Sequence, residues 1–455
     1  MTDLSVQALG SLTELRRHCD AIDALNLASR RPCPFSTLEY LETFLAHDEF
    51  GAKEAELLAL LAFDAGQLVG YLPLRRHRAF VGTHLPYTRV GVMVSHDTDR
   101  PHVVARPEDE ARCAQAFYGH LLGRKDWSLL ELNFQDAESA LSTPPPPSPL
   151  RYWVRRYENM PISRLPVAWK DLGGYLATLS KSRRKVLVRS LRRTFQAGQV
   201  EAVSSSDPAG LGELLALYLD VEHRSWKEAA RAGVGRDPRR VAFFEALMAP
   251  GQPMPMTAHL LVLDGLPVAG AVVGVFGGVM HALEICFDQD YEHLGCGHVG
   301  GLLTFRQASA LGLREVNLNG NYAYNKANLG AEPTLTWAVQ VYRVGSLPWL
   351  KAQAGRARRW LRPPPAEAPQ FNPERRAHET HAAVRPARDE ERARAKATLD
   401  AVEARGVTLE RLSGAALEAA LGLTHSTEAQ EAGRRRIIAI HSTRKAAEER
   451  LTQLG

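Results

Sequence analysis

Four glycines lie close together in the segment GCGHVGG, where the sequence predicts the start of a helix: Gly295, Gly297, Gly300 and Gly301. The first amides of a helix have no partner within it and lie at the positive end of its dipole, so a phosphate binds well there. Gly295 and Gly297 allow the backbone to turn and to approach a phosphate closely. The alternative is a flexible strand-to-helix loop, and the spacing does not match the dinucleotide fingerprint.

Two neighbouring titratable residues lie in a second segment, LDVEHRSWK at 219–227, which is predicted to be helical. Glu222 or His223 would take a proton from an attacking amine if its side chain pointed into a cleft. A surface or packing role is the alternative for each residue. A third segment, CFDQDYEH at 286–293, lacks the glycine and the final glutamate of a calcium loop. The sequence therefore predicts no metal site.

Two further segments are candidates for binding. The polar segment NLNGNYAYNK at 317–326 follows a predicted strand, where α/β enzymes often place chemistry, or it forms a plain polar turn. The basic segment KSRRKVLVRSLRRTF at 181–195 predicts either a solvated helix face or a surface for phosphates, an anionic substrate or a membrane. No GxSxG, HExxH or Walker lysine motif occurs, which argues against those hydrolase and NTPase classes.

The elements that must position these residues occur in the same order in both halves of the chain: a hairpin, a helix and a strand. Asp64–Gly66 and Asp264-Gly265 predict hairpin turns, because Asp and Gly tolerate positive φ, and Gly277-Gly278 predicts a further turn. The predicted ranges are 57–74, 109–122 and 127–133 in the first half, and 259–275, 299–311 and 314–319 in the second. This repeat predicts two similar mixed α/β lobes, of which only the second carries the glycine cluster.

The composition is that of an ordinary soluble globular protein of 455 residues, with 45% hydrophobic and 24% charged residues. A net charge of +5 is small for this length and predicts no general binding to DNA. The five cysteines are scattered without a CxxC pair, which indicates free thiols in a reducing cytosol. The start MTDLSVQALGSLTEL does not resemble a signal peptide, and no apolar run reaches the roughly 20 residues that span a bilayer. We therefore expect a cytoplasmic protein.

Two proline clusters divide the chain into three predicted segments. Pro144–Pro147 predicts an extended connector, and Pro363–Pro365 precedes a charged, alanine-rich region. The last segment is predicted to be a helical extension or a partly disordered tail. The predicted domain limits are 1–150, 151–361 and 362–455, with helices in the last segment over 387–404 and 428–450 and an amphipathic stretch at 407–423.

Together, these motifs resemble those of GNAT-superfamily acyltransferases, in particular the CelD-like branch found near bacterial cellulose and exopolysaccharide genes. The resemblance covers about residues 15–350 and rests on the segments LSKSRRKVLVRSLRR, EHRSW, LDGLPVAGAVVG, FDQDYEHLGCGHVGGLLTFRQASALG and NLNGNYAYNKANLG. It implies two tandem GNAT-like lobes, related to the Fem aminoacyltransferases. It also implies acyl transfer from acetyl-CoA or another acyl-CoA to an amine or sugar-linked acceptor. Three positions depart from the family pattern: Glu292 replaces Gln or Arg, Asn317 replaces Asp, and Tyr324-Asn325-Lys326 interrupts a Tyr-Lys pair.

The resemblance also assigns roles to residues of the second lobe. A strand amide near Glu284–Cys286 would polarise the thioester carbonyl, and the acceptor would bind in a cleft between the lobes. The donor pyrophosphate would bind the loop of Leu294, Gly295, Cys296, Gly297, His298, Val299 and Gly300. The candidate bases are Glu222, His223 and Glu284, the candidate acids are Tyr291 and Tyr324, and Lys326 is a further candidate catalytic residue.

Three alternatives remain. Cys296 could carry the acyl group as a nucleophile, although GNAT chemistry is usually direct. A Fem-like aminoacyltransferase would use aminoacyl-tRNA, with the basic segment 181–195 contacting the tRNA. A catalytically degenerate scaffold in polysaccharide assembly would use the basic segment and the C-terminal segment to bind partners.

Overall fold

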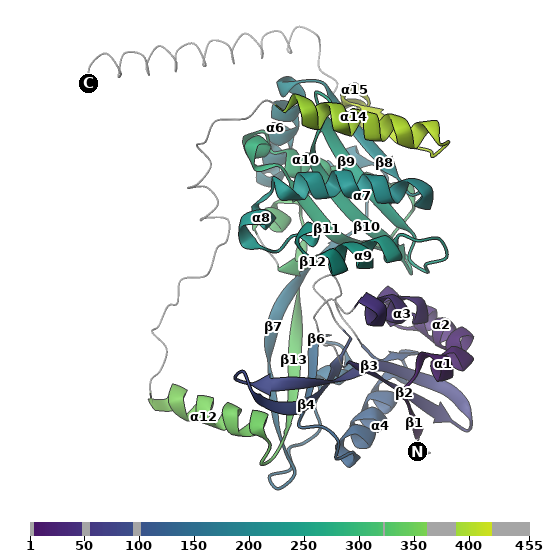
Figure 1. Cartoon of the computed structure of the whole chain (residues 1–455), viewed down its shortest axis with the longest axis vertical. Coiled ribbons are helices and arrows are strands. Elements are labelled where there is room, and N and C mark those ends of the chain that lie inside the picture. Colours follow the sequence, from purple (N-terminus) through teal and green to yellow (C-terminus); the bar gives the residue numbers. More distant parts are fainter. Residues whose placement is uncertain (1–3, 48–54, 94–101, 322–323, 362–387, 421–455) are drawn as a thin grey trace.

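A single mixed sheet runs through the protein in the computed structural model, which describes residues 4–47, 55–93, 102–321, 324–361 and 388–420 (Figure 1). Within these residues the sheet has 14 strands, and β5 (Val104–Ala105) pairs with β3 beside the main path. The strands of the main path are, in spatial order, β1 (Ser5–Leu9), β2 (Glu56–Asp64), β3 (Gln67–Val81), β4 (Leu85–Val92), β6 (Leu129–Asp136), β13 (Glu332–Arg343), β7 (Tyr152–Pro166), β12 (Glu315–Asn321), β11 (Val279–Phe287), β10 (Leu266–Phe276), β9 (Met256–Leu263), β8 (Val200–Ser205) and β14 (Glu410–Ser413).

The first lobe packs helices on both faces of its strands, which explains the unbroken apolar run of β2. Leu58 and Leu60 face α4 (Glu110–Gly123), whereas Leu57 and Leu61 face the opposite helices. Those opposite helices are α2 (Cys19–Ala28) and α3 (Leu38–His47). Shorter helical turns of this lobe are α1 (Leu12–Leu15), η1 (Arg16–His18), η2 (Pro34–Ser36) and η3 (Ala140–Ser142).

The second lobe has the same two-sided arrangement around β8 to β12. One face carries α5 (Leu172–Thr178), α6 (Lys181–Ala197) and α10 (Cys296–Ala310). The other face carries α7 (Pro208–His223), α9 (Pro238–Leu247) and α14 (Asp389–Ala404). The short helices of this lobe are α8 (Trp226–Ala230), η4 (Val234–Arg236), η5 (Gln289–Leu294), α11 (Tyr324–Asn328) and α15 (Gly414–Ala420).

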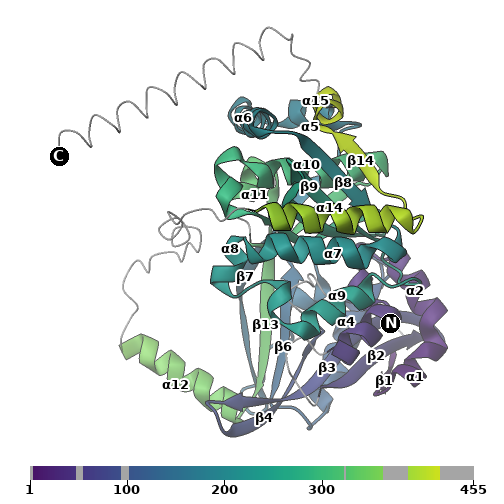
Figure 2. The ribbon, with the colours of Figure 1, turned by 45° about the horizontal axis from the view of Figure 1, so that its top comes forward.

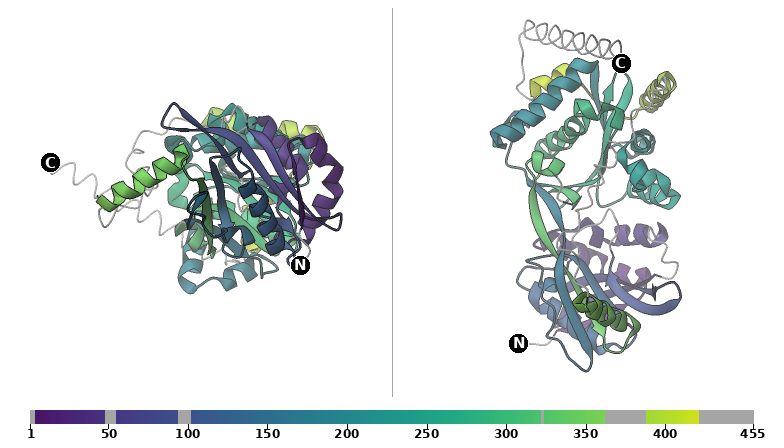
Figure 3. Two further views of the ribbon diagram at one scale, coloured as in Figure 1. Left: turned by 90° about the horizontal axis from the view of Figure 1, so that it is seen from below. Right: turned by 90° about the vertical axis from the view of Figure 1, so that its left-hand side faces the viewer.

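Two long strands and one shared core join the lobes. β7 and β13 pair antiparallel from Tyr152 to Arg164 and run from one lobe to the other (Figure 3). The ring of Tyr40 on α3 lies 5.9 Å from that of Phe243 on α9, edge to face, within one hydrophobic cluster that spans both lobes. α12 (Leu347–Leu361) follows β13 and packs against β3 and β4. The two lobes therefore share a continuous sheet and a continuous core.

The predicted hairpins and the predicted repeat are confirmed. Asp264 and Gly265 have φ of 49° and 78° in the turn between β9 and β10, and Gly277 and Gly278 turn between β10 and β11 with φ of 53° and 77°. In both lobes a helix then connects two parallel strands: α4 connects β4 to β6, and α10 connects β11 to β12. The fold is therefore mixed α/β in two similar lobes, as the repeat predicted.

The part of the C-terminal segment at 388–420 belongs to the second lobe. α14 occupies the region of the predicted helix at 387–404, lies beside α7 and buries Ala395, Leu399 and Val402 (Figure 2). β14, which was not predicted as a strand, pairs antiparallel with β8 and extends the sheet. The predicted helix at 428–450 lies outside the described residues.

The predicted domain limits at 150 and 361 stay a prediction. One strand links the predicted segments 1–150 and 151–361. β13 comes from the segment 151–361, yet it pairs with β6 of the first lobe over Tyr342 to Thr336. Among the helices that the structure describes, none combines the length and the apolar composition needed to cross a bilayer.

One histidine of the second lobe makes folding stability depend on pH. Burial lowers the pKa of His259 to about 4, and its ring nitrogens bond to Ser204 Oγ at 2.7 Å and Gln307 Oε1 at 2.9 Å. Below its usual pKa near 6.5 the histidine of the unfolded chain binds a proton, whereas His259 of the folded protein stays neutral down to about pH 4. Its contribution to the free energy of unfolding is therefore fully present above pH 6.5 and is lost as the pH falls through about 4.

The expected loss of unfolding free energy over this interval is about 3 kcal/mol, measured by denaturant unfolding at several pH values. His259→Gln is expected to flatten that part of the profile. An identical slope in the wild type and in this variant would assign the pH dependence to other groups.

Candidate functional site

The strands β11 and β12 are paired only at their first residues. The parallel pairing joins Val279–His281 to Glu315–Asn317, and no further pair between these strands occurs within the described residues. β11 continues to Phe287 on the β10 side alone. Two parallel strands that separate in this way leave backbone groups of β11 facing a gap in the sheet, a place where a ligand can supply the missing hydrogen bonds.

A β-bulge interrupts β11 beside this gap. Val272 of β10 opposes Glu284, but the next residue, Val273, opposes Ala282, so Leu283 is the extra residue. The bulge turns both Leu283 and Glu284 toward the face of the sheet that α7 covers. Bulges of this kind occur often next to active sites, where they redirect side chains.

The predicted phosphate loop lies at the far end of β11. Gly295 is the N-cap of α10 with φ of 78°, and the helix begins at Cys296, three residues before the start predicted at 299. The amides of His298 and Val299 bond to the Gly295 carbonyl at 3.0 and 3.3 Å. A Cβ atom on Gly297 would lie 2.7 Å from the ring of Phe287, so this glycine packs against the end of β11. The glycines therefore place the positive end of α10 beside the gap between the strands.

α6 packs directly on this loop. A Cβ atom on Gly295 would overlap the Ser190 hydroxyl, which lies 3.3 Å from Nδ1 of His298. Thr194 Oγ1 donates to the Leu294 carbonyl at 3.2 Å, and Arg193 Nη1 donates to the His293 carbonyl at 3.3 Å. The basic segment 181–195 therefore packs against the predicted phosphate loop.

α6 carries seven Lys and Arg residues and no acidic residue. Within the described part of the chain none of the seven forms an ion pair: Lys181, Arg183, Arg184, Lys185, Arg189, Arg192 and Arg193. An unneutralised basic helix raises the local concentration of anions. This surface adjoins the loop to which the sequence analysis assigned a pyrophosphate.

Two of the candidate bases meet in a buried ionic cluster on the opposite face of the sheet. Glu284 contacts Lys227 and accepts from Arg240 Nη2 at 2.9 Å, while Glu222 lies 3.4 Å from Lys227 Nζ. The Tyr218 hydroxyl donates to Glu284 at 3.3 Å. Burial alone lowers the pKa of Lys227, but the neighbouring carboxylates outweigh it and raise the pKa above its usual value. The cluster therefore holds its lysine charged.

His223, the third candidate base, points away from this cluster. It is the last residue of α7, its side chain is 54% exposed, and Nδ1 lies 3.3 Å from Glu228 on α8. Neighbouring residues on a helix point about 100° apart, so Glu222 and His223 cannot both face one cleft.

The remaining candidate catalytic residues lie on other elements than the residues of this cluster. Tyr291 lies in η5, with Arg388 Cζ 5.7 Å from its ring centre. Lys326 Nζ donates to the carbonyls of Leu318, at 2.8 Å, and Asn319, so it holds the turn after β12. Tyr324 begins α11, and its side chain lies outside the described part of the structure.

Cys296 is fully buried at the first turn of α10. Its thiol lies 3.6 Å from the Val268 carbonyl and 3.5 Å from the Tyr291 carbonyl, and burial raises its pKa to about 12. A thiol that stays protonated is a weak nucleophile. This environment speaks against an acyl group carried on Cys296.

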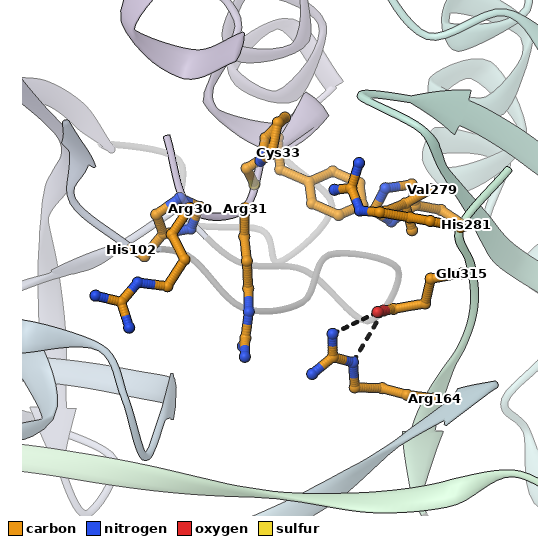
Figure 4. A pocket seen from close by; sticks show the side chains of 11 residues that line it. Arg30, Arg31, Cys33, His102, Arg164, Val279, His281 and Glu315 are labelled. Atoms are coloured by element: carbon orange, nitrogen blue, oxygen red, sulfur yellow. Dashed lines mark hydrogen bonds and ion pairs between the residues drawn. The ribbon is translucent and has the colours of Figure 1, made fainter. Parts of the chain in front are cut away.

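A cavity of about 110 Å³ lies between the lobes, next to the point where β11 and β12 separate (Figure 4). His281 is the last residue of β11 that pairs with β12, and it also lines this cavity. Arg164 of β7 lines it as well and binds Glu315 with Nε–Oε1 of 2.9 Å. From the first lobe, the lining residues are Arg30, Arg31, Pro32, Cys33, Phe35 and His102.

His281 and Arg164 were not predicted from the sequence. A histidine inside the largely apolar strand VMHALEICF was a usable signal for His281, whereas the position of Arg164 depends on β7 lying beside β12.

Comparison with known proteins agrees with this architecture. Residues 181–326 match the family described as an acetyltransferase (GNAT) domain. A crystal structure of FemX superposes with a TM-score of 0.51 at 11% identity, covering 76% of this chain and 99% of that one. A tandem GNAT protein from the clavulanic acid biosynthesis pathway gives a TM-score of 0.41 at 14% identity, covering 75% and 99%. The C-terminal domain of a putative lysylphosphatidylglycerol synthetase from Agrobacterium fabrum gives 0.44 at 12%, covering 77% and 97%.

A search of curated protein sequences found no match. The domain match covers the region from the start of α6 to Lys326, which contains the gap between β11 and β12 and the whole of the predicted phosphate loop. The chain therefore has a tandem GNAT-like fold, and residues 181–326 of its second lobe match a GNAT acetyltransferase domain.

Proposed function

We propose that this protein is an N-acyltransferase that moves an acyl group from acetyl-CoA or another acyl-CoA directly to an amine or sugar-linked acceptor. One observation carries the proposal: β11 and β12 separate in front of the N-terminus of α10, within a region that matches a GNAT acetyltransferase domain. The resemblance to the CelD-like branch suggests an acceptor from polysaccharide or envelope biosynthesis.

In this proposal the donor lies along the gap. Its pyrophosphate binds at the loop from Leu294 to Gly300, at the positive end of α10 and beside the basic side chains of α6. Its extended arm pairs with the edge of β11 that has no neighbouring strand among the described residues, and an amide near Glu284–Cys286 bonds to the thioester carbonyl. The acceptor enters from the inter-lobe cavity, which adjoins the gap at His281.

The reaction is a direct attack on the thioester. The acceptor nitrogen forms a bond to the acyl carbon while the bond from that carbon to sulfur breaks. The nitrogen loses one proton to a base, and the thiolate takes one proton to leave as free CoA. Glu284 is the proposed base because, among the three candidates, it alone lies on the strand that borders the gap. Tyr291 and Tyr324 stay the proposed acids.

The proposal predicts release of free thiol from acetyl-CoA that depends on an added amine, measured with a thiol-reactive chromophore across a panel of amino sugars and amines. Acyl product should form in equal amount, detected by mass spectrometry. Thiol release that is independent of every acceptor, or no release from any acyl-CoA, would contradict it.

The unpaired basic residues of α6 support a second candidate, a Fem-like transfer from aminoacyl-tRNA, because a polyanion suits such a helix. This candidate predicts that the protein retards tRNA in a gel and that raised salt abolishes the retardation. Acyl-CoA binding without retardation of tRNA would discard it.

A further inference from the structure

Asp288 is a buried carboxylate between β11 and η5, immediately before the phosphate loop. Its side chain is fully buried and caps η5 by accepting from the amide of Asp290 at 3.0 Å. Arg224, from the end of α7, donates to it through Nε at 2.8 Å. A buried carboxylate needs such partners, because removal from water is costly for an unpaired charge.

A second arginine reaches the same place from the C-terminal segment. Arg388 binds Asp288 through Nη1 and Asp290 through Nη2, and its side chain is only 12% exposed. Its guanidinium also lies near the ring of Tyr291 in η5. One side chain therefore contacts three of the residues that lead into the phosphate loop.

Arg388 is held in this position by the rest of its segment. It is the N-cap residue of α14, whose residues Leu399 and Val402 are buried against the second lobe. Oε2 of Glu391, one turn later, lies 3.6 Å from Nη1 of Arg224 and 3.9 Å from Nε of Arg388. The two arginines thus share an acidic partner on α14 as well as Asp288, and the contact is part of a packed network.

We propose that Arg388 is a positioning residue for the donor site, which it serves by fixing η5 and neutralising the acidic residues next to the loop. η5 leads directly into Gly295, whose amide bonds to the Glu292 carbonyl at 2.8 Å, so a shift of η5 moves the first amides of α10. Without Arg388, Asp290 would lose this positive neighbour within a few residues of a bound phosphate, and its repulsion of the phosphate would be stronger. This role rests on the proposed function.

The test compares Arg388→Gln with Arg405→Gln, measuring the Kd of CoA by calorimetry in the full-length protein. Arg405 belongs to the same segment and pairs with Glu213 of α7, away from the loop. We expect Arg388→Gln to raise the Kd about tenfold, a size typical of coupling between sites, and Arg405→Gln to leave it unchanged. Arg388→Lys keeps the positive charge and should restore part of the affinity. The restoration should be incomplete, because an ammonium cannot span both carboxylates as a guanidinium does.

Hydrogen exchange provides a readout that does not need the ligand. The amides of residues 289–299 should exchange faster in Arg388→Gln than in the wild type or in Arg405→Gln. Unchanged exchange in this segment, or equal Kd values for the two variants, would overturn the proposal. If the wild type does not bind CoA but exchange is still faster in Arg388→Gln, Arg388 does fix this segment, and the proposal that the donor is an acyl-CoA is wrong.

Discussion

Replacing Gly295 by valine is expected to weaken CoA binding by about 100-fold and to lower the free energy of unfolding by about 2–4 kcal/mol. The backbone at this position has φ of 78°, which a β-branched residue avoids. Its Cβ atom would also overlap the Ser190 hydroxyl of α6. The loop must therefore move away from α6, and the amides of the first turn of α10 move with it.

Gly301→Ala is the matched control, because it lies in the same helix with ordinary helical φ. Its Cβ atom would meet nothing closer than Leu329 Cδ1 at 3.8 Å, and alanine favours a helix over glycine by about 1 kcal/mol. We expect this variant to bind CoA as the wild type does, with unchanged or higher stability. Calorimetric titration and denaturant unfolding of both variants measure the two effects, and wild-type CoA affinity in Gly295→Val would refute the assignment of the loop.

Lys227→Met is expected to destabilise the fold by about 3–5 kcal/mol, the cost of removing one partner from a buried ion pair. The ammonium group is buried between Glu284 and Glu222 and also bonds to the Tyr218 hydroxyl at 3.1 Å. Without it, Glu284 keeps its contact with Arg240, whereas the Glu222 carboxylate loses its contact with the ammonium group. Chemical unfolding at neutral pH measures the loss.

Two further variants separate the causes of that loss. Arg236→Gln breaks an ion pair with Glu228 in which both side chains are 38% exposed, and should cost less than about 1 kcal/mol. The double variant Lys227→Met with Glu284→Gln removes one carboxylate charge and should recover part of the stability. If Glu284 is the base, this double variant folds but does not transfer the acyl group. A Lys227→Met variant as stable as Arg236→Gln would show that the cluster contributes little.

Local patterns predicted most of the architecture. The turn at Asp264-Gly265 could be located because its φ angles and the flanking apolar runs depend on neighbouring residues alone. The repeat of hairpin, helix and strand then predicted two lobes. The glycines predicted the start of α10 to within three residues, since only a residue that tolerates positive φ fits the N-cap observed at Gly295.

Contacts between distant segments could not be predicted in this way. Glu222 and Glu284 meet because α7 packs across β11, and nothing in either local sequence indicates Lys227 or Arg240 as their partners. β13 lies between β6 and β7, although it follows β12 in the chain. The separation of β11 from β12 is likewise a property of strand pairing. The different directions of the Glu222 and His223 side chains could have been predicted from the sequence, since helical periodicity already places them on different faces.

The most direct test of the central claim is a calorimetric titration of the wild-type protein with CoA and acetyl-CoA, alongside Gly295→Val and Gly301→Ala. The proposed donor site predicts saturable binding to one site per chain, retained in Gly301→Ala and about 100-fold weaker in Gly295→Val. It also predicts a rise in the unfolding temperature with ligand concentration, because a ligand that binds only the folded state stabilises it. Absence of binding by the wild type, or equal binding by both variants, would contradict the claim that the gap between β11 and β12 and the N-terminus of α10 hold an acyl-CoA.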